Sequence, residues 1–407
     1  MTKTERVKKA TDRYLIPVYT RNGIVAARGK GSRLWDAEGR RYLDLFPGWG
    51  VGALGHTHPR VARAVARQIR SLLHVPNNFM HAGQAELARQ LVRRSFPGKV
   101  FFTNSGAEAV EGAVKLARRF GWTAAPGRRR FEIITMQGAF HGRTYAALAA
   151  TGQAKYSRPF KPLPGGFKQV PFNDLKAVQK AVTRKTIAVL LEPVQGEGGI
   201  HVASTAYLKG LRALCRRKKL LLILDEVSSG MGRTGQWFAF QGAGIRPDIL
   251  LLAKPMAGGL PIGAIIARPD VADRLEEGMH ATTFGGNPVV TAAGLAALEA
   301  IDREKLIANT RREGKRWRAG LLKLQRRFPE IREVRGRGLM LGLELTRPGK
   351  RLVEIAAAEG ILINCTQERV IRLYPALNIR PAETREGLAK LERALLWFHI
   401  EQRKERR

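Results

Sequence analysis

Five apolar segments, each followed by a polar or glycine-rich turn and then a helical pattern, constrain the fold of this 407-residue chain most strongly. They span residues 99–109, 131–144, 186–199, 220–230 and 248–259. Continuous apolar strands that alternate with helices are typical of a mostly parallel sheet covered on both faces. The sequence therefore predicts an α/β fold built around such a sheet.

The residues at the ends of these strands are suited to chemistry. In open α/β sheets, ligands bind beyond the carboxyl ends of the strands. The residues at those ends are Asn104 and Ser105, Phe140 and His141, Glu192, Asp225, and Lys254. Lys254 alone could be an ordinary solvated loop lysine. Its position beside four other strand ends favours one crevice to which all five strands contribute.

The patterns on either side of this region predict the domain organisation. We expect residues 1–50 to form an N-terminal, hairpin-like arm that joins a small domain, and residues 51–288 to form the large domain. Residues 289–407 alternate between long helical patterns and shorter strands, such as VRGRGLMLGLEL at 334–345. This alternation predicts a smaller α+β domain at the C-terminal end.

The chain is strongly basic, with 71 Lys+Arg against 34 Asp+Glu and a formal net charge of +37. Such a surface attracts polyanions in a salt-dependent way. The excess is spread along the whole chain, without a helix-turn-helix, an RNA-binding signature or a basic patch interleaved with aromatic residues. We therefore expect a basic enzyme surface, and no specific binding of nucleic acid.

The sequence predicts a cytoplasmic protein that does not enter a membrane. No apolar run approaches the ~18–20 residues that cross a bilayer. The first residues, MTKTERVKKATDRY, are charged and lack the apolar region of a signal peptide. Only two cysteines occur, Cys215 and Cys365, so neither a disulfide framework nor a cysteine metal site is expected.

Two short motifs resemble binding sites, but turns explain them better. GVGALG at 50–55 matches the dinucleotide fingerprint, yet a poor strand precedes it and no acidic residue follows about twenty positions later. His56 and His58 could bind a metal, but no second cluster of ligands accompanies them. We expect neither a nicotinamide site nor a metal site.

Four features at the strand ends together fit pyridoxal phosphate. TNSGAEA at 103–109 opens a helix, whose free N–H groups and Ser105 hydroxyl can hold a phosphate, although an N-cap serine would also explain the motif. Asp225 ends a hydrophobic strand, where a carboxylate needs a strong partner such as a protonated pyridine nitrogen. The cofactor also needs a lysine and a ring-stacking residue, for which Lys254 and Phe140 are the candidates.

Motifs over nearly the whole chain carry a family resemblance. The strongest are FFTNSGAEAVEGAVKLAR, FHGRT, EPVQGEGG, DEVSSGMGRTG, LAKPMAGGLPIGA and TTFGGNP. The chain resembles the class III aminotransferases of the ornithine/acetylornithine type, which have fold type I. The resemblance implies a mostly parallel seven-stranded sheet in the large domain, a smaller α+β domain, and a homodimer whose active sites are shared between subunits.

The resemblance also implies which residues bind the cofactor. Lys254 would bond to the cofactor and later move the substrate proton, while Asp225 would pair with the pyridine nitrogen. Thr283 would reach the phosphate from the neighbouring subunit. The other residues expected around the cofactor are Ser105, Gly106 and Ala107 at the phosphate, Phe140 and Val227 on the two faces of the ring, and Ser228 near the ring oxygen.

Four further residues are expected to contact the substrates. Arg143 would hold a substrate carboxylate, because a guanidinium can bind it with two hydrogen bonds. Glu197 would pair with Arg372 in one half-reaction and release it in the other, so that Arg372 can bind the distal carboxylate of 2-oxoglutarate. Thr282 would lie near the substrate.

The sequence departs from the family pattern at two positions. Ser228 stands where a glutamine usually reaches the ring oxygen, which puts the contact to that oxygen in doubt. Pro255 replaces the small residue that commonly follows the lysine, and it fixes the backbone and removes one N–H group. Neither change removes a catalytic group.

The resemblance predicts transfer of the terminal amino group of N-acetylornithine, or a close relative, to 2-oxoglutarate. The products would be a semialdehyde and glutamate, as in arginine biosynthesis. Alternative donors are lysine or ornithine linked to an acidic carrier protein, free ornithine, 4-aminobutyrate and polyamines. An alternative of another class is a polyanion-binding protein on a degenerate aminotransferase fold, which the net charge suggests and the intact Lys254 and Asp225 oppose.

Overall fold

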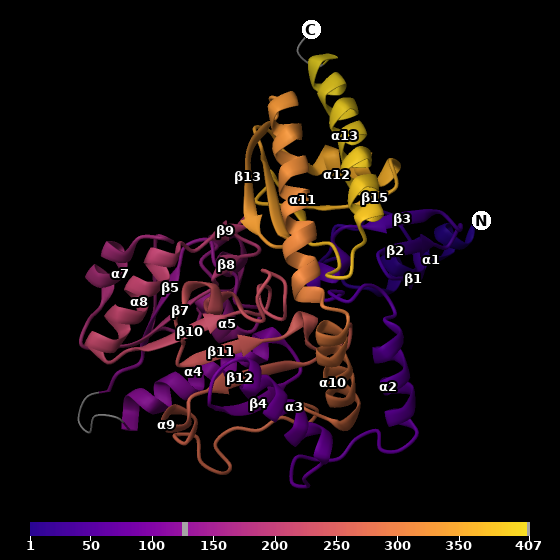
Figure 1. Ribbon diagram of the computed structural model, residues 1–407. Coiled ribbons are helices and arrows are strands. Elements are labelled where there is room, and N and C mark those ends of the chain that lie inside the picture. Colours follow the sequence, from indigo (N-terminus) through magenta and orange to yellow (C-terminus); the bar gives the residue numbers. More distant parts are fainter. Residues whose placement is uncertain (124–128, 405–407) are drawn as a thin grey trace.

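The computed structural model describes residues 1–123 and 129–404, and a seven-stranded sheet lies at its centre (Figure 1). The strand order is β4-β12-β11-β10-β7-β5-β6. The strands are β4 (Lys99–Thr103), β5 (Glu132–Met136), β6 (Phe167–Val170), β7 (Thr186–Leu191), β10 (Leu221–Asp225), β11 (Ile249–Leu252) and β12 (Gly263–Ala267). Only β12 runs antiparallel to its neighbours. The predicted mostly parallel seven-stranded sheet is confirmed.

The apolar character of the central strands follows from burial on both faces. Every residue of β10 is buried. Leu222 and Leu224 pack into the larger hydrophobic core, whereas Leu221 and Ile223 pack into a second core on the other face. Since successive side chains of a strand point to opposite faces, a strand with a core on each side must be apolar throughout.

Helices and short elements connect the strands and cover the sheet. The helices of this part are α2 (Pro59–Ile69), α3 (Ala82–Arg94), α4 (Gly106–Thr123), α5 (Tyr145–Ala150), α6 (Ala154–Ser157), α7 (Leu175–Ala181), α8 (Thr205–Lys218), α9 (Pro269–Ala272) and α10 (Pro288–Arg303). Two short strands, β8 (Val194–Gln195) and β9 (His201–Val202), pair with each other. No helix within residues 1–123 and 129–404 is long and apolar enough to cross a membrane.

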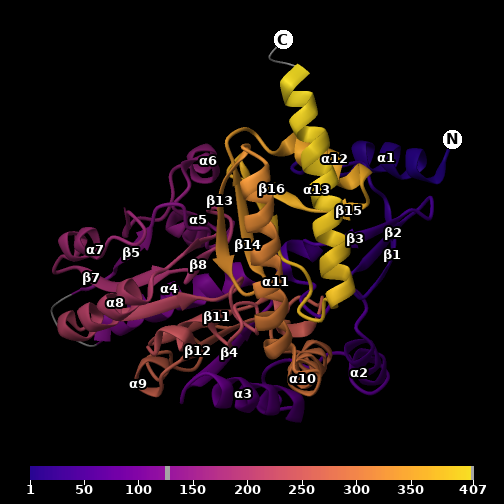
Figure 2. The same ribbon diagram turned by 45° about the horizontal axis from the view of Figure 1, so that its top comes forward.

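The C-terminal part forms a second, antiparallel sheet in the order β13-β14-β17-β16. Its strands are β13 (Ile331–Arg337), β14 (Met340–Leu345), β16 (Asn364–Thr366) and β17 (Val370–Leu373). The helices here are α11 (Leu306–Arg327), α12 (Lys350–Ala358) and α13 (Pro381–Lys404). Figures 1 and 2 show α11 and α13 side by side, with the second sheet beside them. The predicted helices are present, but the segment 334–345, expected as one strand, is divided between β13 and β14, which pair antiparallel.

The N-terminal arm joins the C-terminal part through a third sheet. Strands β1 (Ala26–Lys30), β2 (Arg33–Asp36) and β3 (Arg41–Asp44) pair antiparallel, and β15 (Ile361–Leu362) adds parallel to β3. The arm also begins with a helix, α1 (Lys3–Tyr14), which the sequence analysis missed. Its start has a capping box between Thr2 and Glu5, a visible signal in the sequence. The domain boundaries at residues 50 and 288 stay a prediction.

A close backbone contact beside β5 gives a test of the fold. A Cβ atom at Gly152 would lie 2.0 Å from the carbonyl oxygen of Met136, whereas one at Gly165 would meet nothing within 4 Å. We expect Gly152→Ala to lower the free energy of unfolding by about 2–3 kcal/mol, because two backbone segments must move apart. Gly165→Ala, the matched control, should change it by less than about 0.5 kcal/mol. Denaturant unfolding of both variants measures this, and equal effects would contradict the packing described.

Candidate active site

A cavity of about 480 Å³ lies at the carboxyl edge of the large sheet. Its size is within the ~300–1,000 Å³ usual for small-molecule sites. All five strand ends named from the sequence contribute to its wall. The predicted site residues that line it are Ser105, Gly106, Ala107, Phe140, Arg143, Asp225, Val227, Ser228 and Lys254, and Asn104, His141 and Glu192 line it as well.

Lys254 follows β11 in a strained backbone conformation. Its φ of 30° is one that residues other than glycine rarely adopt. Lys254 begins a short 3₁₀ turn, Lys254–Ala257, in which Pro255 follows it. The Nζ atom donates a hydrogen bond to Ser228 Oγ at 2.5 Å. Burial lowers the pKa of Lys254, although the nearby carboxylates of Glu192 and Asp225 oppose this. The strained backbone therefore holds an amine that loses its proton more readily than an exposed lysine does.

Asp225 ends β10 as a buried carboxylate with both oxygen atoms engaged. Oδ1 accepts a hydrogen bond from the backbone N–H of Val227 at 3.0 Å. Oδ2 lies 2.8 Å from Nδ1 of His141, which is buried as well. The Nε2 atom of His141 has no hydrogen-bond partner within the described chain. These contacts fix the direction of the carboxylate, and its place in the cavity wall leaves it available to a ligand.

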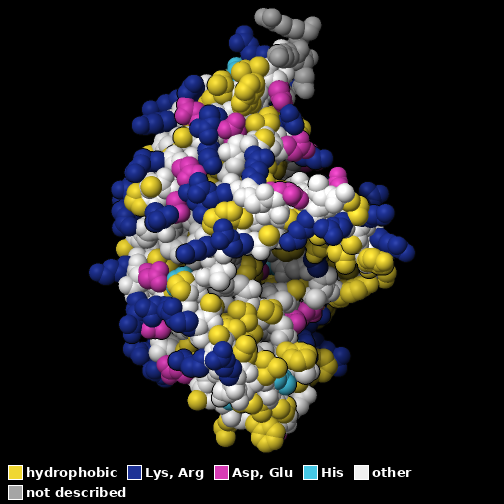
Figure 3. All heavy atoms as spheres, turned by 90° about the vertical axis from the view of Figure 1, so that its right-hand side faces the viewer, with side chains coloured by type: hydrophobic (Ala, Val, Ile, Leu, Met, Phe, Trp, Pro, Cys, Tyr) yellow, Lys and Arg dark blue, Asp and Glu magenta, His cyan; other side chains and the backbone are white. Residues whose placement is uncertain are grey.

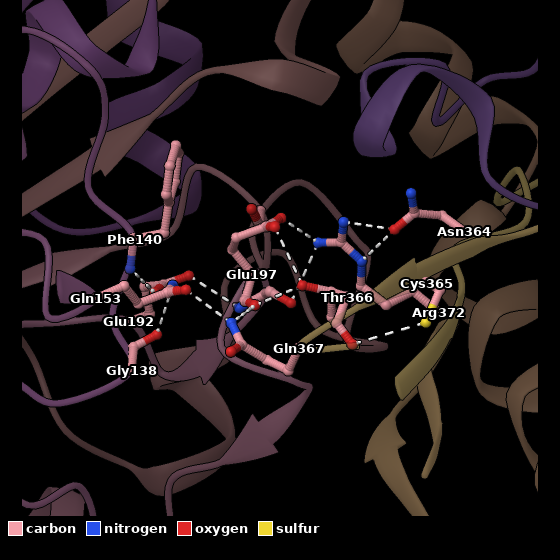
Figure 4. A network of polar contacts seen from close by, with 12 residues as sticks. Gly138, Phe140, Gln153, Glu192, Glu197, Asn364, Cys365, Thr366, Gln367 and Arg372 are labelled. Carbon is pink, nitrogen blue, oxygen red and sulfur yellow. Dashed lines mark hydrogen bonds and ion pairs between the residues drawn. The ribbon is translucent and has the colours of Figure 1, made fainter. Parts of the chain in front are cut away.

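Glu192, just after β7, connects two turns of the cavity wall. Its carboxylate accepts hydrogen bonds from the N–H groups of Phe140, at 2.9 Å, and Gly196, at 3.0 Å (Figure 4). Burial, together with the nearby Asp225 carboxylate, raises the pKa of Glu192 to about 7. The turn that carries the Phe140 ring is therefore held against the end of β7 by this hydrogen bond.

The start of α4 has the features of a phosphate cradle. Gly106 and Ala107 lie in its first turn, whose N–H groups have no partner within the helix. A Cβ atom at Gly106 would lie only 2.9 Å from Val227 Cγ1, so a side chain there would crowd the wall of the cavity. Together with the cavity size and the available carboxylate, these features fit pyridoxal phosphate.

Outside the lining of this cavity, the buried Arg372 forms an ion pair with the partly exposed Glu197. Arg372 Nη1 lies 2.7 Å from Glu197 Oε2, and its Nε and Nη2 atoms both donate to Asn364 (Figure 4). Tyr156 and Thr366 donate hydrogen bonds to Glu197 Oε1. Burial alone would raise the pKa of Glu197, but Arg372 and these hydrogen bonds lower it below its usual value. The pair is therefore fully charged near neutral pH.

Arg143 lies on the aromatic side of the cavity. Its guanidinium is 4.0 Å from the ring centre of Tyr156 and 5.5 Å from that of Phe140. It has no carboxylate partner within the described part of the chain. Since Tyr156 also donates a hydrogen bond to Glu197, one tyrosine contacts both Arg143 and the carboxylate that pairs with Arg372.

Thr282 and Thr283 lie near the cavity wall but outside its lining. They line a separate hollow with Asn77 and Met80, and Thr282 Oγ1 accepts a hydrogen bond from Asn104 at 3.2 Å. Within one chain, neither threonine lines the cavity that holds Lys254. This placement agrees with the expectation that Thr283 acts on a neighbouring subunit, which stays a prediction.

Four residues that support this site were not predicted from the sequence. Tyr156 on the short helix α6, and Asn364, Thr366 and Gln367 in and just after β16, surround the Glu197–Arg372 pair. No local motif marks them. The expectation that the protein has no metal site stays a prediction. Among the described residues, no group of three or more histidine, cysteine, aspartate or glutamate side chains could hold a metal ion.

Comparison with known proteins gives consistent matches. The family described as aminotransferase class-III matches residues 17–395. Acetylornithine aminotransferase of Methanocaldococcus jannaschii is 47% identical over 90% of this chain and 92% of its own length. The enzyme of the same name from Caldanaerobacter subterraneus is 45% identical over 94% of this chain and 97% of its own.

Solved structures agree with these sequence matches. The ornithine aminotransferase of Toxoplasma gondii superposes with a TM-score of 0.95 and 33% identity, over 98% of this chain and 97% of that one. A second structure of that enzyme is described with pyridoxal phosphate at its active site. The N-acetylornithine aminotransferase of Stenotrophomonas maltophilia has a TM-score of 0.82 and 37% identity, over 96% of this chain and 98% of that one.

The Glu197–Arg372 pair predicts a pH-dependent stability. Glu197→Gln should lower the free energy of unfolding by about 2 kcal/mol near pH 7, because it leaves Arg372 buried without its counter-charge. Since the pKa of Glu197 is depressed, the pair stabilises the fold above the ordinary glutamate value of 4.5 and ceases to do so as the pH falls through the lower folded-state value.

Unfolding curves of both proteins from pH 7 down to about pH 3 should therefore converge. A constant difference across that range would mean that the loss comes from packing and not from charge.

Proposed function

Because the chain belongs to the class III aminotransferase family, whose members depend on pyridoxal phosphate, we propose that this transaminase uses N-acetylornithine. In this proposal the terminal amino group passes to 2-oxoglutarate, and the products are a semialdehyde and glutamate, as in arginine biosynthesis. The observation that carries the proposal is the ion pair between Glu197 and the buried Arg372, next to the cavity of Lys254. The names of the relatives agree with it.

When bound, the cofactor supplies a ring that takes up the electrons of the carbon–hydrogen bond beside the amino group. In the proposed mechanism, Lys254 Nζ accepts the proton from that carbon and returns it, which a lowered pKa favours. Asp225, oriented by His141, keeps a proton on the pyridine nitrogen. Gly106 and Ala107 would hold the phosphate, with Ser105 beside them, and Phe140 and Val227, which also line the cavity, would lie against the ring.

Arg372 is the residue proposed to distinguish the two half-reactions. 2-Oxoglutarate has a carboxylate at each end, so it needs two cations, and we assign Arg143 and Arg372 to them. The amino donor does not present a second free carboxylate at its reacting end. Glu197 then stays paired with Arg372 while the donor is bound, which avoids leaving a buried cation without a partner.

The proposal includes a homodimer with shared active sites. Apolar side chains are exposed between α2 and α3 and near residue 284: Met80 is 100% exposed, Phe79 65% and Phe284 59%. Figure 3 shows hydrophobic side chains (yellow) gathered at the lower end of the face that carries α2. A contiguous apolar surface of this kind favours contact with a second copy. Thr282 and Thr283 lie beside this surface, from which they would reach the partner's cavity.

A donor linked to an acidic carrier protein is a second candidate substrate. The net charge of +37 favours it, since a strongly positive surface raises the association rate of an acidic partner. In this case turnover of the linked donor would fall steeply with added salt, while that of free N-acetylornithine would not.

Turnover of a panel of amino donors with 2-oxoglutarate tests the proposal. The panel contains N-acetylornithine, ornithine, 4-aminobutyrate, a polyamine and a carrier-linked amine. We expect N-acetylornithine to give the highest kcat/KM. A clear preference for any other donor would contradict the substrate proposed here.

Arg372 gives a prediction that separates the half-reactions. Arg372→Ala should reduce kcat/KM for 2-oxoglutarate by about 100-fold or more, since a charge-assisted pair with the second carboxylate of 2-oxoglutarate is lost. Arg347→Ala changes an arginine elsewhere and serves as the control. Single-turnover measurements should show a much smaller loss in the donor half-reaction. Equal losses in both would make Arg372 structural.

The proposed dimer gives a further prediction. Met80→Lys places a charge within the apolar surface and should shift the protein toward monomers in sedimentation experiments at micromolar concentration. Trp397→Lys, which changes an exposed apolar residue on α13, is the matched control and should leave the dimer intact. A dimer of unchanged affinity in the Met80 variant would place the interface elsewhere.

A further inference from the structure

A second hollow, of about 1250 Å³, lies at the opposite edge of the large sheet and is lined mainly by cations. Nine of its fifteen lining residues are lysine or arginine, and none is aspartate or glutamate. They come from the segments before β5 and before β7, from the end of α8, and from Arg268 after β12. We call it the basic hollow.

Only two of these cations have a carboxylate partner in the described chain. Arg212 and Arg268 both pair with Asp248, at 2.8 and 2.6 Å. The others, such as Arg184, Lys185 and Lys219, make no ion pair with residues 1–123 or 129–404. Like charges held together raise the free energy of the folded chain unless a counter-charge binds. The basic hollow is therefore a strong attractor for an anion.

Several cations are held in place by the fold. The Arg130 guanidinium donates to the backbone carbonyls of Thr186, Lys219 and Lys218, so it is fixed between the start of β7 and the end of α8. Arg212 is 7% exposed, and its Nε atom has no hydrogen-bond partner within the described residues. A preorganised cation loses little conformational freedom on binding, which favours affinity.

Cations near the end of α8 also stabilise the negative end of that helix, which would explain Arg216 and Lys218 without a ligand. That effect does not account for Arg129, Arg184 or Lys185, which come from other segments and face the same hollow. Contributions from four separate segments indicate a shared binding function.

The basic hollow is separate from the cofactor cavity. Strand β10 connects the two, because Leu221 at its start lines the hollow and Asp225 at its end lines the cavity. Four residues of a strand span roughly 13 Å. An anion in the hollow is therefore distinct from the cofactor phosphate.

We propose that the basic hollow binds a small ligand with several linked phosphates. Arginine binds phosphate oxygens through paired hydrogen bonds, and lysines add point charges. Cations arranged around a hollow suit a flexible phosphate chain, whereas a nucleic acid is usually bound along an extended basic stripe or groove with exposed aromatic side chains. The proposal does not depend on which amino donor the enzyme uses.

Calorimetric titration of the holoenzyme with inorganic tripolyphosphate tests this proposal. The holoenzyme is used because the cofactor then occupies its own phosphate site. At physiological ionic strength we expect one tripolyphosphate per chain. The double variant Arg184→Gln/Lys185→Gln should weaken binding about tenfold, because each cation that contacts a phosphate adds to the affinity.

The matched control is Lys323→Gln/Arg326→Gln on α11, which removes the same charge from exposed positions outside the hollow. It should leave the affinity nearly unchanged. Equal weakening by the two double variants, or many weak sites per chain, would show attraction to the whole surface and overturn the proposal. So would the absence of tripolyphosphate binding, or binding only of a single-stranded oligonucleotide.

Two further measurements complete the experiment. A titration with ATP identifies the kind of ligand, and an independent variant shows whether a loss of binding comes from misfolding. ATP that binds no better than tripolyphosphate would show that only the phosphate chain is recognised, and tighter ATP binding would point to a nucleotide. Lys219→Asn is an independent variant, because asparagine tolerates the left-handed φ of 52° at that position. It should also weaken tripolyphosphate binding while the thermal midpoint stays unchanged.

Discussion

The structure of the site depends on how the buried charges at the carboxyl edge of the large sheet are satisfied. Asp225 and Glu192 are buried carboxylates, and the Lys254 amine shares their cavity. A buried carboxylate costs several kcal/mol unless donors surround it. Here the donors are His141 and three backbone N–H groups, all from turns that follow the strands. The need to satisfy these oxygens therefore fixes the turns that form the cavity.

The sequence predicted the parts of this arrangement that local patterns encode. Continuous apolar strands ending in a polar turn indicated the parallel sheet, and the strand ends at Asp225 and Lys254 indicated the cavity. The helix α1 and the antiparallel strand β12 were missed, although the capping box of Thr2 and Glu5 marks the former. Strand β12 lies within a longer apolar stretch after Lys254, where its direction depends on tertiary pairing.

The polar residues that surround Arg372 could not be predicted, because they come from separate segments of the chain. Asn364 fixes its guanidinium from the neighbouring strand β16, and Tyr156 reaches the same pair from the segment after α5. These residues meet only because the C-terminal sheet packs over the edge of the large one. About half of the chain separates Tyr156 from Asn364, so no spacing rule links them. The family resemblance indicated that Glu197 pairs with Arg372, whereas the fold determined which polar residues surround that pair.

The central claim is that Lys254 carries the cofactor in this cavity. Reduction of the holoenzyme with borohydride fixes the cofactor to the amine to which it is bonded, and mass spectrometry of the digested protein then locates it. We predict one pyridoxyl group per chain, on the peptide that contains Lys254. Modification of another lysine instead, or an unmodified Lys254 in active enzyme, would contradict the account.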